Sequence, residues 1–411
     1  MKKKLSLLLI VTSILYSNPT DFSIIINKPF NDALFDITQD YDRQISAIGF
    51  SQSFKKSDTT KNQKSYNDVF SYLNSLSSNY GSQAHLVKVN KYGSITISKT
   101  TTLNSFNKAT AIVKTPTNGY FVGGYTLEGS LILLKLNSNG DTIFSKIFGT
   151  NNYDKLNNMI LLADGGILTI GSAVTSRSKN DLLFETGLGK NDIYLTRFSK
   201  DGQKIWSKKF GTKDDDTGVD AVEAKDGSII VVSTHSFGTK KELSLMRITE
   251  NGDKIWLKKY KSEKNVTPYK LLRLRDNNFI LTLSYQDDME KEQIRLLKFD
   301  MYKNILLDKN IITSYSSVLK DIKELSDSSI VAVGSVRDEF NSDGLVMILD
   351  TSLTMLKQEH YGDDNYDEFN ALTILHNSQI AVAGRNTAKN SQESNMWIVK
   401  LNKDGTLAQK N

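Results

Sequence analysis

The sequence contains no cysteine among its 411 residues. This absence excludes disulfides, thiolate metal sites, a cysteine nucleophile and a lipid anchor on an N-terminal cysteine. Histidine is scarce, and no two of the histidines lie at the spacing of metal ligands, so a histidine-based metal site has no support. They are His85, His235, His360 and His376. Motifs for nucleotide binding or hydrolase chemistry are also missing. The sequence therefore assigns no reaction and predicts no cofactor.

Long apolar runs and clustered charges are missing as well. Beyond the N-terminus, no segment approaches the roughly 20 apolar residues of a membrane-spanning helix. The net charge is +6, but the basic residues are scattered and form no arginine-rich run. This pattern argues against a nucleic-acid partner. Hydrophobic residues make up 39% of the chain, and without disulfides the core alone must hold it together. We therefore expect one compact domain that is monomeric.

The N-terminus has the pattern of a secretory signal peptide. In "MKKKLSLLLIVTSILYS", three lysines precede a short apolar run that gives way to polar chain. We expect residues 1–17 to be removed after Ser17; the alternative is an uncleaved N-terminal anchor. The mature chain, residues 18–411, is then expected in the periplasm or outside the cell, in the envelope of a Gram-negative bacterium.

One phrase recurs along the chain. "NGDTIFSKIFG" covers 139–149, "DGQKIWSKKFG" covers 201–211 and "NGDKIWLKKY" covers 251–260. The surroundings recur with it, so each repeat holds four short apolar runs, a to d. They are rich in Val, Ile, Leu, Phe and Tyr, and Gly and Asn interrupt them too often for helices. Asn-Gly and Asp-Gly pairs at the a–b and c–d joints predict two-residue hairpins. Each repeat is therefore expected to be a four-stranded antiparallel meander.

The number and period of the repeats predict an all-β fold, a seven-bladed β-propeller. The blades are expected at about 30–105, 106–149, 150–211, 212–260, 261–311, 312–362 and 363–409. Phe144, Trp206 and Trp256 share one d-strand position and are expected to pack between blades. The last repeat has only a weak d run, whereas the segment "FSIIIN" (22–27) belongs to no repeat. We expect this segment to complete the last blade as its outer strand.

The repeat resembles that of exported bacterial seven-bladed propellers, whose pattern is close to D-x-W-L-x-K-x-D-x-x-G-x-x-x-W-x-x-x-F-G-G-x-x-x-D. Residues 191–216 fit the pattern well, and residues 394–405 fit its first half. Repeats five and six have drifted, with Lys303 and Leu353 at the hairpin glycine position. The phrase is also similar, more weakly, to that of quinone-dehydrogenase propellers and a related outer-membrane-assembly scaffold. The resemblance implies an architecture and supplies no catalytic residues.

The long loops predict the binding face. Tight a–b and c–d turns occupy one face of such a ring, whereas the b–c and d–a loops occupy the other. The b–c insertion of the first blade, at about 51–82, places apolar residues at helical spacing, and that of the third blade, 173–192, contains "LLFETGLG". We take six of their residues as binding-face candidates. They are Val69, Tyr72, Leu73, Leu76, Leu183 and Phe184. The equally weighted alternative is that the two insertions cover the end of the ring and bind no partner.

Two further sets of residues recur. Asp154, Asp216 and Asp367 each lie five residues after a glycine in a d–a loop. These aspartates could hold a hard cation such as Ca²⁺, or they could accept hydrogen bonds from backbone N–H groups in the turn. We favour the second role, because every d–a turn needs such a hydrogen bond whereas a metal needs only one site. A basic residue also recurs in run c, where its head is expected to reach solvent or a neighbouring blade's carboxylate. These residues are Lys88, Lys135, Arg197, Arg247, Lys298 and Lys400, and Ile348 interrupts the set.

The sequence thus predicts a non-enzymatic, exported propeller that binds a protein or an envelope component through its b–c/d–a face. The alternative is a glycan-binding or glycan-cleaving protein with its site at the central mouth of that face. Asp216 and Asp367 would then be the candidate carboxylates.

Overall fold

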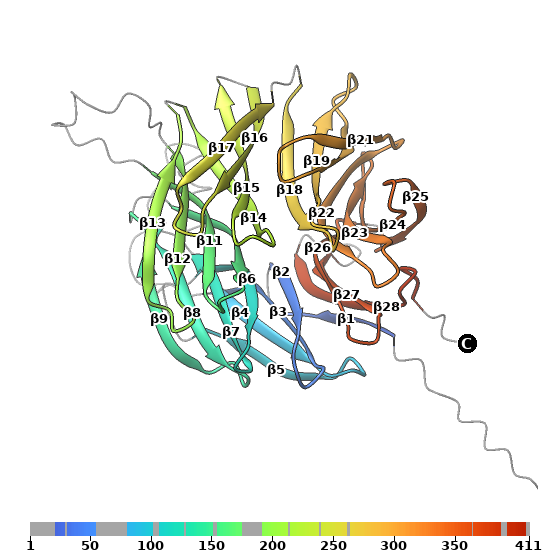
Figure 1. The fold of residues 1–411 in the computed structure, drawn as a ribbon. Helices are drawn as coiled ribbons and strands as arrows, with labels where there is room; N and C mark the ends of the chain where they lie inside the picture. Colours follow the sequence, from blue (N-terminus) through green and yellow to red (C-terminus); the bar gives the residue numbers. More distant parts are fainter. Residues whose placement is uncertain are drawn as a thin grey trace, which may run out of the picture.

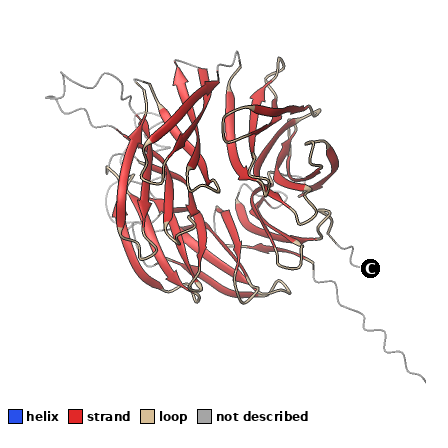
Figure 2. Ribbon diagram, in the orientation of Figure 1, coloured by secondary structure: helices blue, strands red, loops and turns tan. Residues whose placement is uncertain are grey.

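The computed structural model describes residues 21–28, 31–54, 80–101, 107–126, 129–150, 154–174, 191–212, 214–237, 240–260, 264–363, 365–387 and 393–407. Within these ranges the chain forms strands and turns and no helix (Figure 2). Accordingly, the described residues include no helix that is long and apolar enough to cross a membrane. The predicted signal peptide lies outside the described residues, and so do residues 55–79 and 175–190 of the two loop insertions, whose ends belong to strands.

The strands form seven four-stranded antiparallel sheets arranged as a ring (Figure 1). The predicted seven-bladed β-propeller is confirmed. Blade 1 holds β2 (Asp32–Gln39), β3 (Ile45–Phe54), β4 (Tyr80–Val89) and β5 (Ile95–Thr100). Blade 2 holds β6 (Lys108–Thr115), β7 (Gly119–Tyr125), β8 (Leu131–Asn137) and β9 (Thr142–Phe148). Blade 3 holds β10 (Lys155–Leu161), β11 (Ile167–Val174), β12 (Asn191–Phe198) and β13 (Lys204–Phe210).

The remaining blades continue in the same order around the ring. Blade 4 holds β14 (Asp216–Glu223), β15 (Ile229–Phe237), β16 (Lys240–Ile248) and β17 (Lys254–Tyr260). Blade 5 holds β18 (Val266–Arg273), β19 (Phe279–Gln286), β20 (Glu292–Phe299) and β21 (Ile305–Ile311). Blade 6 holds β22 (Ser316–Glu324), β23 (Ile330–Arg337), β24 (Ser342–Leu349) and β25 (Met355–Tyr361). Blade 7 holds β26 (Glu368–Ile374), β27 (Ile380–Thr387), β28 (Ser394–Leu401) and β1 (Phe22–Ile26).

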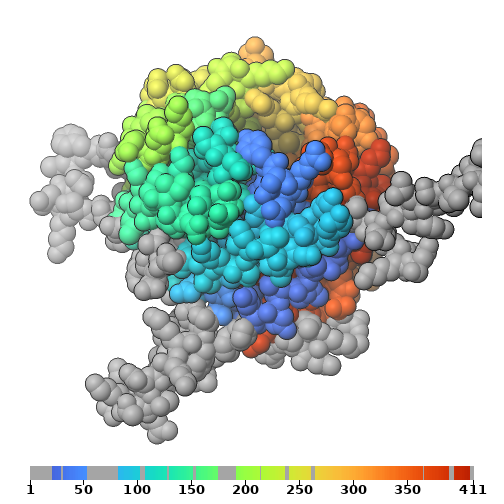
Figure 3. All heavy atoms as spheres, turned by 90° about the horizontal axis from the view of Figure 1, so that it is seen from below, coloured from blue at the N-terminus to red at the C-terminus, as the bar shows by residue number. Residues whose placement is uncertain are grey.

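The ring is closed by the N-terminal strand, as the sequence predicts. β1 pairs with β28 in antiparallel register from Phe22 opposite Lys400 to Ile26 opposite Met396. Ile26 is buried in a core shared by blades 7 and 1, and Trp397 Nε1 donates to Ser23 Oγ at 2.9 Å. In Figure 3 the blue N-terminal segments lie against the red C-terminal ones. The first and last parts of the chain thus share one sheet.

The c–d hairpins differ from the predicted two-residue form. In blade 2, Gly140 N donates to Asn137 O and Asn137 N donates to Asp141 O, which closes a three-residue loop. Only the last loop residue has a positive φ, 75° at Gly140, whereas a two-residue type I′ turn needs two such residues. Lys303 and Leu353 hold the same position with φ values of 69° and 60°. The hairpin geometry therefore survives where glycine is absent.

These hairpin glycines explain the recurring phrase. Phe144 of blade 2 lies beneath Gly202 of blade 3, and a Cβ atom at Gly202 would come within 2.1 Å of the Phe144 ring. A Cβ atom at Gly252 of blade 4 would lie 3.2 Å from the Trp206 ring of blade 3 and 2.9 Å from Lys208, and Trp206 Nε1 donates to Glu250 O at 3.0 Å. The aromatic residue of one blade thus packs under the hairpin of the next, which accounts for its repetition.

β1 reproduces this arrangement where the ring closes. Phe22 stands opposite Lys400, just as Trp206 stands opposite Arg197, and its ring lies against Gly93 of the first blade. The N-terminal strand therefore supplies the aromatic contact that the repeat phrase supplies elsewhere.

Candidate functional site

The basic residues of the third strands hold neighbouring blades together. Arg197 pairs with Asp164 of its own blade at 2.8 Å and donates to Glu250 O of the next blade at 2.7 Å. Lys88 is buried, pairs with Asp40 at 2.8 Å and donates to Ser138 O of the next blade at 3.2 Å. Arg197 Nη1 also lies 3.9 Å from Glu250 Oε2, so the expected pairing with a neighbouring blade's carboxylate is present at Arg197. The nearer contacts of Arg197 and Lys88 are a carboxylate of their own blade and a backbone carbonyl of the next blade.

The other members of the set make related contacts. Lys135, Arg247 and Lys400 each donate to a hairpin carbonyl of the following blade, at Lys200, Met301 and Lys91 respectively. Lys298 Nζ lies 3.7 Å from Asp276 Oδ2 in its own blade. Lys135, Arg247 and Lys400 thus connect neighbouring blades, whereas the contact of Lys298 stays within one blade.

The three d–a loop aspartates lie at or immediately before the start of an innermost strand, where they are buried. Asp154 Oδ1 accepts hydrogen bonds from Thr150 Oγ1 and from Val174 N, at 2.6 and 3.1 Å. Asp216 accepts from Thr212 N at 2.7 Å and contacts His235 Nδ1 at 2.7 Å. These contacts tie the loop to the first and second strands of a blade.

Asp367 makes the same kind of contact in blade 7. Its carboxylate accepts from Asp363 N and Thr387 N, each at 2.7 Å. Burial raises the pKa of Asp367 to about 6, and the nearby carboxylates of Asp363 and Asp343 add to the effect, against the two backbone donors. Within the described ranges no three His, Asp or Glu side chains are grouped so that they could hold a metal ion.

The binding-face candidates of the two insertions, Val69, Tyr72, Leu73, Leu76, Leu183 and Phe184, lie outside the described residues. Another part of the same face carries exposed apolar side chains. They belong to the b–c and d–a loops of blades 5 to 7, and Phe340 and Met289 are 83% and 78% exposed. The full set is Met289, Ile312, Tyr315, Phe340 and Tyr366, which we call the apolar arc.

Backbone and side-chain hydrogen bonds fix the loops that carry the apolar arc. In blade 5, Lys291 Nζ donates to Ser314 O at 2.7 Å, and Gln293 Oε1 accepts from Thr313 N at 2.8 Å. In blade 6, Ser342 N donates to Asn365 O at 3.0 Å, and Ser342 forms an isolated parallel bridge with Tyr366. Each b–c loop is thus bonded to the d–a loop that follows it, which fixes the positions of the loops that carry the apolar side chains.

A second site lies on the axis of the ring. Each innermost strand has a register shift against its neighbour at the same position. The extra residue of a bulge reverses the alternation of side chains and turns the following residue to another direction. The residues after these shifts are Asp36, Ala111, Asn158, Asp220, Lys270, Asp321 and Ala371, one from each blade, which we call the axial ring.

Three aspartates of the axial ring join neighbouring blades. Asp36 accepts from Ile37 N and from Ile112 N of blade 2, at 2.9 and 2.8 Å. Asp220 makes the equivalent bonds to Ala221 N and Leu271 N of blade 5, each at 2.8 Å. Asp321 likewise bonds to Ile322 N and Leu372 N of blade 7, each at 2.8 Å. Burial raises the pKa of Asp36 to about 6.

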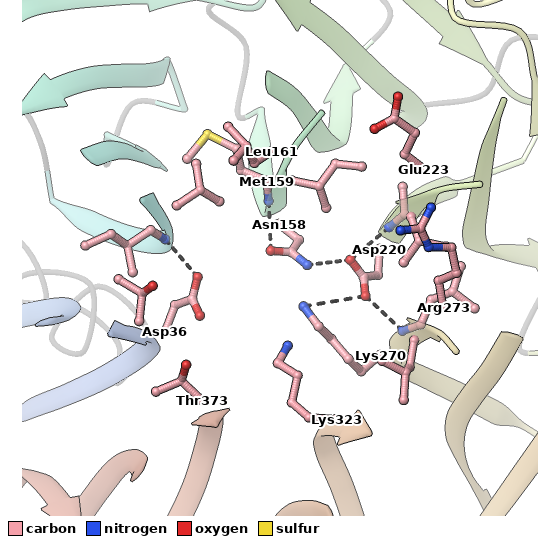
Figure 4. A pocket seen from close by; sticks show the side chains of 18 of the residues that line it. Asp36, Asn158, Met159, Leu161, Asp220, Glu223, Lys270, Arg273, Lys323 and Thr373 are labelled. Carbon is pink, nitrogen blue, oxygen red and sulfur yellow. Dashed lines mark hydrogen bonds and ion pairs between the residues drawn. The ribbon is translucent and has the colours of Figure 1, made fainter. Parts of the chain in front are cut away.

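A cavity of about 520 Å³ extends from the axial ring toward the a–b hairpins. Its lining comes from the second halves of the innermost strands of all the blades, and seven charged residues line it. They are Asp36, Asp220 and Glu223, and Lys114, Lys270, Arg273 and Lys323. Figure 4 shows the amines of Lys270 and Lys323 pointing into the middle of the cavity. This end of the axis lies on the tight-turn face, opposite the expected binding face.

The sequence analysis missed this cavity, although one signal was present. Asp32 and Asp36 are four residues apart, as are Asp216 and Asp220, and Asp154 and Asn158 repeat the spacing with an amide. The recurrence of a second polar residue inside an apolar run indicates a position that lies outside the apolar cores between the blades.

Comparisons with known proteins support the architecture. No family model matches the chain, and the search of curated proteins finds no match. Solved structures with the same fold include Kuenenia stuttgartiensis hydrazine synthase, with a TM-score of 0.53 and 9% identity over 87% of this chain and 94% of that one. A Dyadobacter fermentans protein of unknown function has a TM-score of 0.52 and 11% identity over 94% and 98% of the two chains.

A puromycin hydrolase mutant has a TM-score of 0.54 and 11% identity, over 94% of this chain and 55% of that one. At such identities the similarity establishes the fold alone. The protein is thus a seven-bladed β-propeller, and its activity must be argued from its own surface.

Proposed function

We propose that the protein is an exported propeller that serves as a rigid, non-enzymatic platform for a protein partner in the bacterial cell envelope. The observation that carries the proposal is the apolar arc on the b–c and d–a loops of blades 5 to 7. Isolated exposed apolar residues are common, but five large ones on adjoining loops of one face favour an interface. Met, Tyr and Phe, which make up most of the arc, are enriched in protein–protein interfaces.

The charges around the apolar arc favour a partner with basic side chains. Exposed acidic residues flank the apolar ones on the same loops, although the whole chain has a net charge of +6. They are Asp288, Glu290, Asp338, Glu339 and Asp363. A surface with apolar anchors and an acidic rim matches an apolar patch surrounded by Lys or Arg, and such complementarity gives specificity and a faster association rate.

Export is supported by the sequence of residues 1–17, and the repeat phrase supports membership of the exported propeller family that it resembles. The alternative, a glycan site at the mouth of the b–c/d–a face, would use Asp216 and Asp367. Both oxygens of each already accept hydrogen bonds from their own loop and strands, so this function receives no comparable support.

Affinity capture from native envelope tests the proposal. The double variant Ile312→Ser, Phe340→Ser removes two apolar anchors, whereas Ile147→Ser removes an exposed apolar residue of the outer strand of blade 2, which is 65% exposed. We expect a captured protein to be lost with the double variant and retained with Ile147→Ser. Because all three side chains are exposed, the unfolding free energies should change by no more than about 0.5 kcal/mol.

If wild type, the double variant and the control all capture the same proteins, the proposed interface is contradicted. Recovery of the chain in the cytoplasm, with residues 1–17 still attached, would contradict export. A weaker capture at higher salt, with the anchors intact, would support the role of the acidic rim.

A further inference from the structure

The axial cavity contains two amines in an unusual environment. Lys270 Nζ lies 3.6 Å from Asp220 Oδ2, and Lys323 Nζ lies 3.5 Å from Asp321 Oδ1. Both distances exceed those of ordinary N–H···O hydrogen bonds. Burial alone would lower the pKa of Lys270, but the carboxylates of Asp220, Asp321 and Asp36 raise it, so the amine is charged at neutral pH. Two amines therefore point into one cavity.

The carboxylates and the amines of the cavity are not in equivalent positions. Asp36, Asp220 and Asp321 each use both oxygens to accept backbone N–H groups from two blades. They are fixed parts of the blade junctions. An ammonium group has three donors on a flexible stem, so Lys270 and Lys323 can move toward a ligand between them.

At the entrance of the cavity, too, the carboxylate is held by a hydrogen bond to the backbone, whereas the cationic side chains are more accessible. Glu223, its only acidic residue near the a–b hairpins within the described ranges, accepts from Ala163 N of blade 3 at 2.6 Å. Lys114 lies over the ring of Tyr41 at 4.0 Å, and Arg273 is exposed. The cations at the entrance are thus more available than the carboxylate. Thr38 and Thr373 add hydroxyl groups to the lining.

We propose that the axial cavity binds a small anion, a carboxylate or a phosphate ester, between Lys270 and Lys323. The oxygens of such a ligand would accept from both amines, and Arg273 and Lys114 would attract it to the entrance. The cavity of about 520 Å³ has the size of a small-molecule site. The inference does not rest on the proposed function, because the cavity and the apolar arc lie on opposite faces.

Calorimetric titration of the full mature chain tests the site with inorganic phosphate and citrate as probes and glucose as a neutral comparison. We expect one anion per chain and no heat with glucose. Lys270→Met and Lys323→Gln should each weaken binding about tenfold, the value of one charge-assisted hydrogen bond. Lys309→Met, which removes an exposed lysine of β21, should leave the affinity unchanged.

Binding of phosphate alone would assign a phosphate ester, and binding of citrate alone would assign a carboxylate. The inference is overturned if neither anion binds at about 10 mM, or if both lysine variants bind as wild type does. Because Lys270 is partly buried, Lys323→Gln keeps the test valid if Lys270→Met fails to fold. A loss of anion binding with retained partner capture would separate this site from the apolar arc.

Discussion

At the scale of single residues, hairpin glycines have two separable roles. Gly202 and Gly227 have nearly the same φ, 77° and 78°, but a Cβ atom at Gly202 would clash with Phe144, whereas one at Gly227 would meet nothing within 4 Å. The two positions therefore distinguish backbone conformation from packing between blades.

We predict that Gly227→Ala lowers the free energy of unfolding by about 1 kcal/mol, the cost of a left-handed conformation. Gly202→Ala should lose about 1–3 kcal/mol more, because the Phe144 ring must move. Urea denaturation of both variants measures the difference. Equal losses would contradict the role assigned to Phe144.

The raised pKa of Asp367 predicts a pH-dependent stability. Its folded pKa of about 6 exceeds the ordinary 3.8, so between these values the folded chain holds a proton that the unfolded chain releases. Its contribution to stability therefore falls as the pH rises through about 6. The side chain in Asp367→Asn cannot titrate. The unfolding free energy of wild type minus that of the variant should therefore be about 1.4 kcal/mol more positive at about pH 5 than at about pH 7.5.

Asp164→Asn provides a control without a pH trend in this range. Burial alone would raise the pKa of Asp164, but Gly166 N and Arg197 lower it below the ordinary 3.8. Its stabilising contribution is therefore lost only as the pH falls below about 4, and the stability difference from wild type should be the same at about pH 5 and about pH 7.5. Denaturation at both pH values measures the two variants, and a change for Asp164→Asn as large as that for Asp367→Asn would contradict the assigned environments.

At the scale of the element, the closing strand β1 has one buried and one exposed side. Ile26 is 5% exposed in the core between blades 7 and 1, whereas its neighbour Ile25 is 48% exposed. We predict that Ile26→Ala lowers the free energy of unfolding by about 2–5 kcal/mol and that Ile25→Ala changes it by less than about 0.5 kcal/mol. Thermal and urea unfolding measure both. A similar effect at the two positions would contradict the register of β1 on β28.

The strands could be predicted because their signals are local and repeated. Turn residues such as Gly140 and Gly202 stand at fixed offsets from apolar runs. With seven copies of the repeat to compare, the hairpin position can be recognised even where another residue replaces glycine, as at Lys303. The unassigned run at 22–27 indicated the closing strand because a ring leaves no sheet incomplete.

The axial cavity could not be predicted in the same way. Its lining draws on every blade, and the bulges reverse the side-chain alternation on which a strand prediction depends. Lys270 and Lys323 belong to the most irregular run of their repeats, where no motif distinguishes them from surface lysines. The apolar arc was missed because Phe340 and Met289 stand in short loops that do not repeat.

At the scale of the whole molecule, closure by β1 predicts that the protein tolerates circular permutation, in which the natural ends are joined and the chain is opened elsewhere. A circular permutant joins Leu407 to Asp21 through roughly ten flexible residues, begins at Asn191 and ends at Val174. Because β1 already lies beside β28, the linker restores a continuous blade, and we expect an all-β circular dichroism spectrum and a Tm within about 3 °C of wild type.

A permutant opened between Val231 and Val232 in the buried strand β15 is the control, and it should not fold. Failure of the first permutant to fold would contradict the expectation that closure by β1 and β28 permits a new chain order, and folding of the control would show that even a cut inside a buried strand is tolerated.

The pairing of β1 with β28 also determines when the molecule can be finished. A ribosome makes β1 first and β28 after every other strand, so the earliest segment must wait for almost the entire chain before it finds its partner. Such a distant contact is slow to form, because the intervening chain must be brought together first. During translation the nascent chain therefore lacks its closing contact until β28 has been made. For the export proposed above, this delay would leave the chain in an open state that a membrane translocase can still thread.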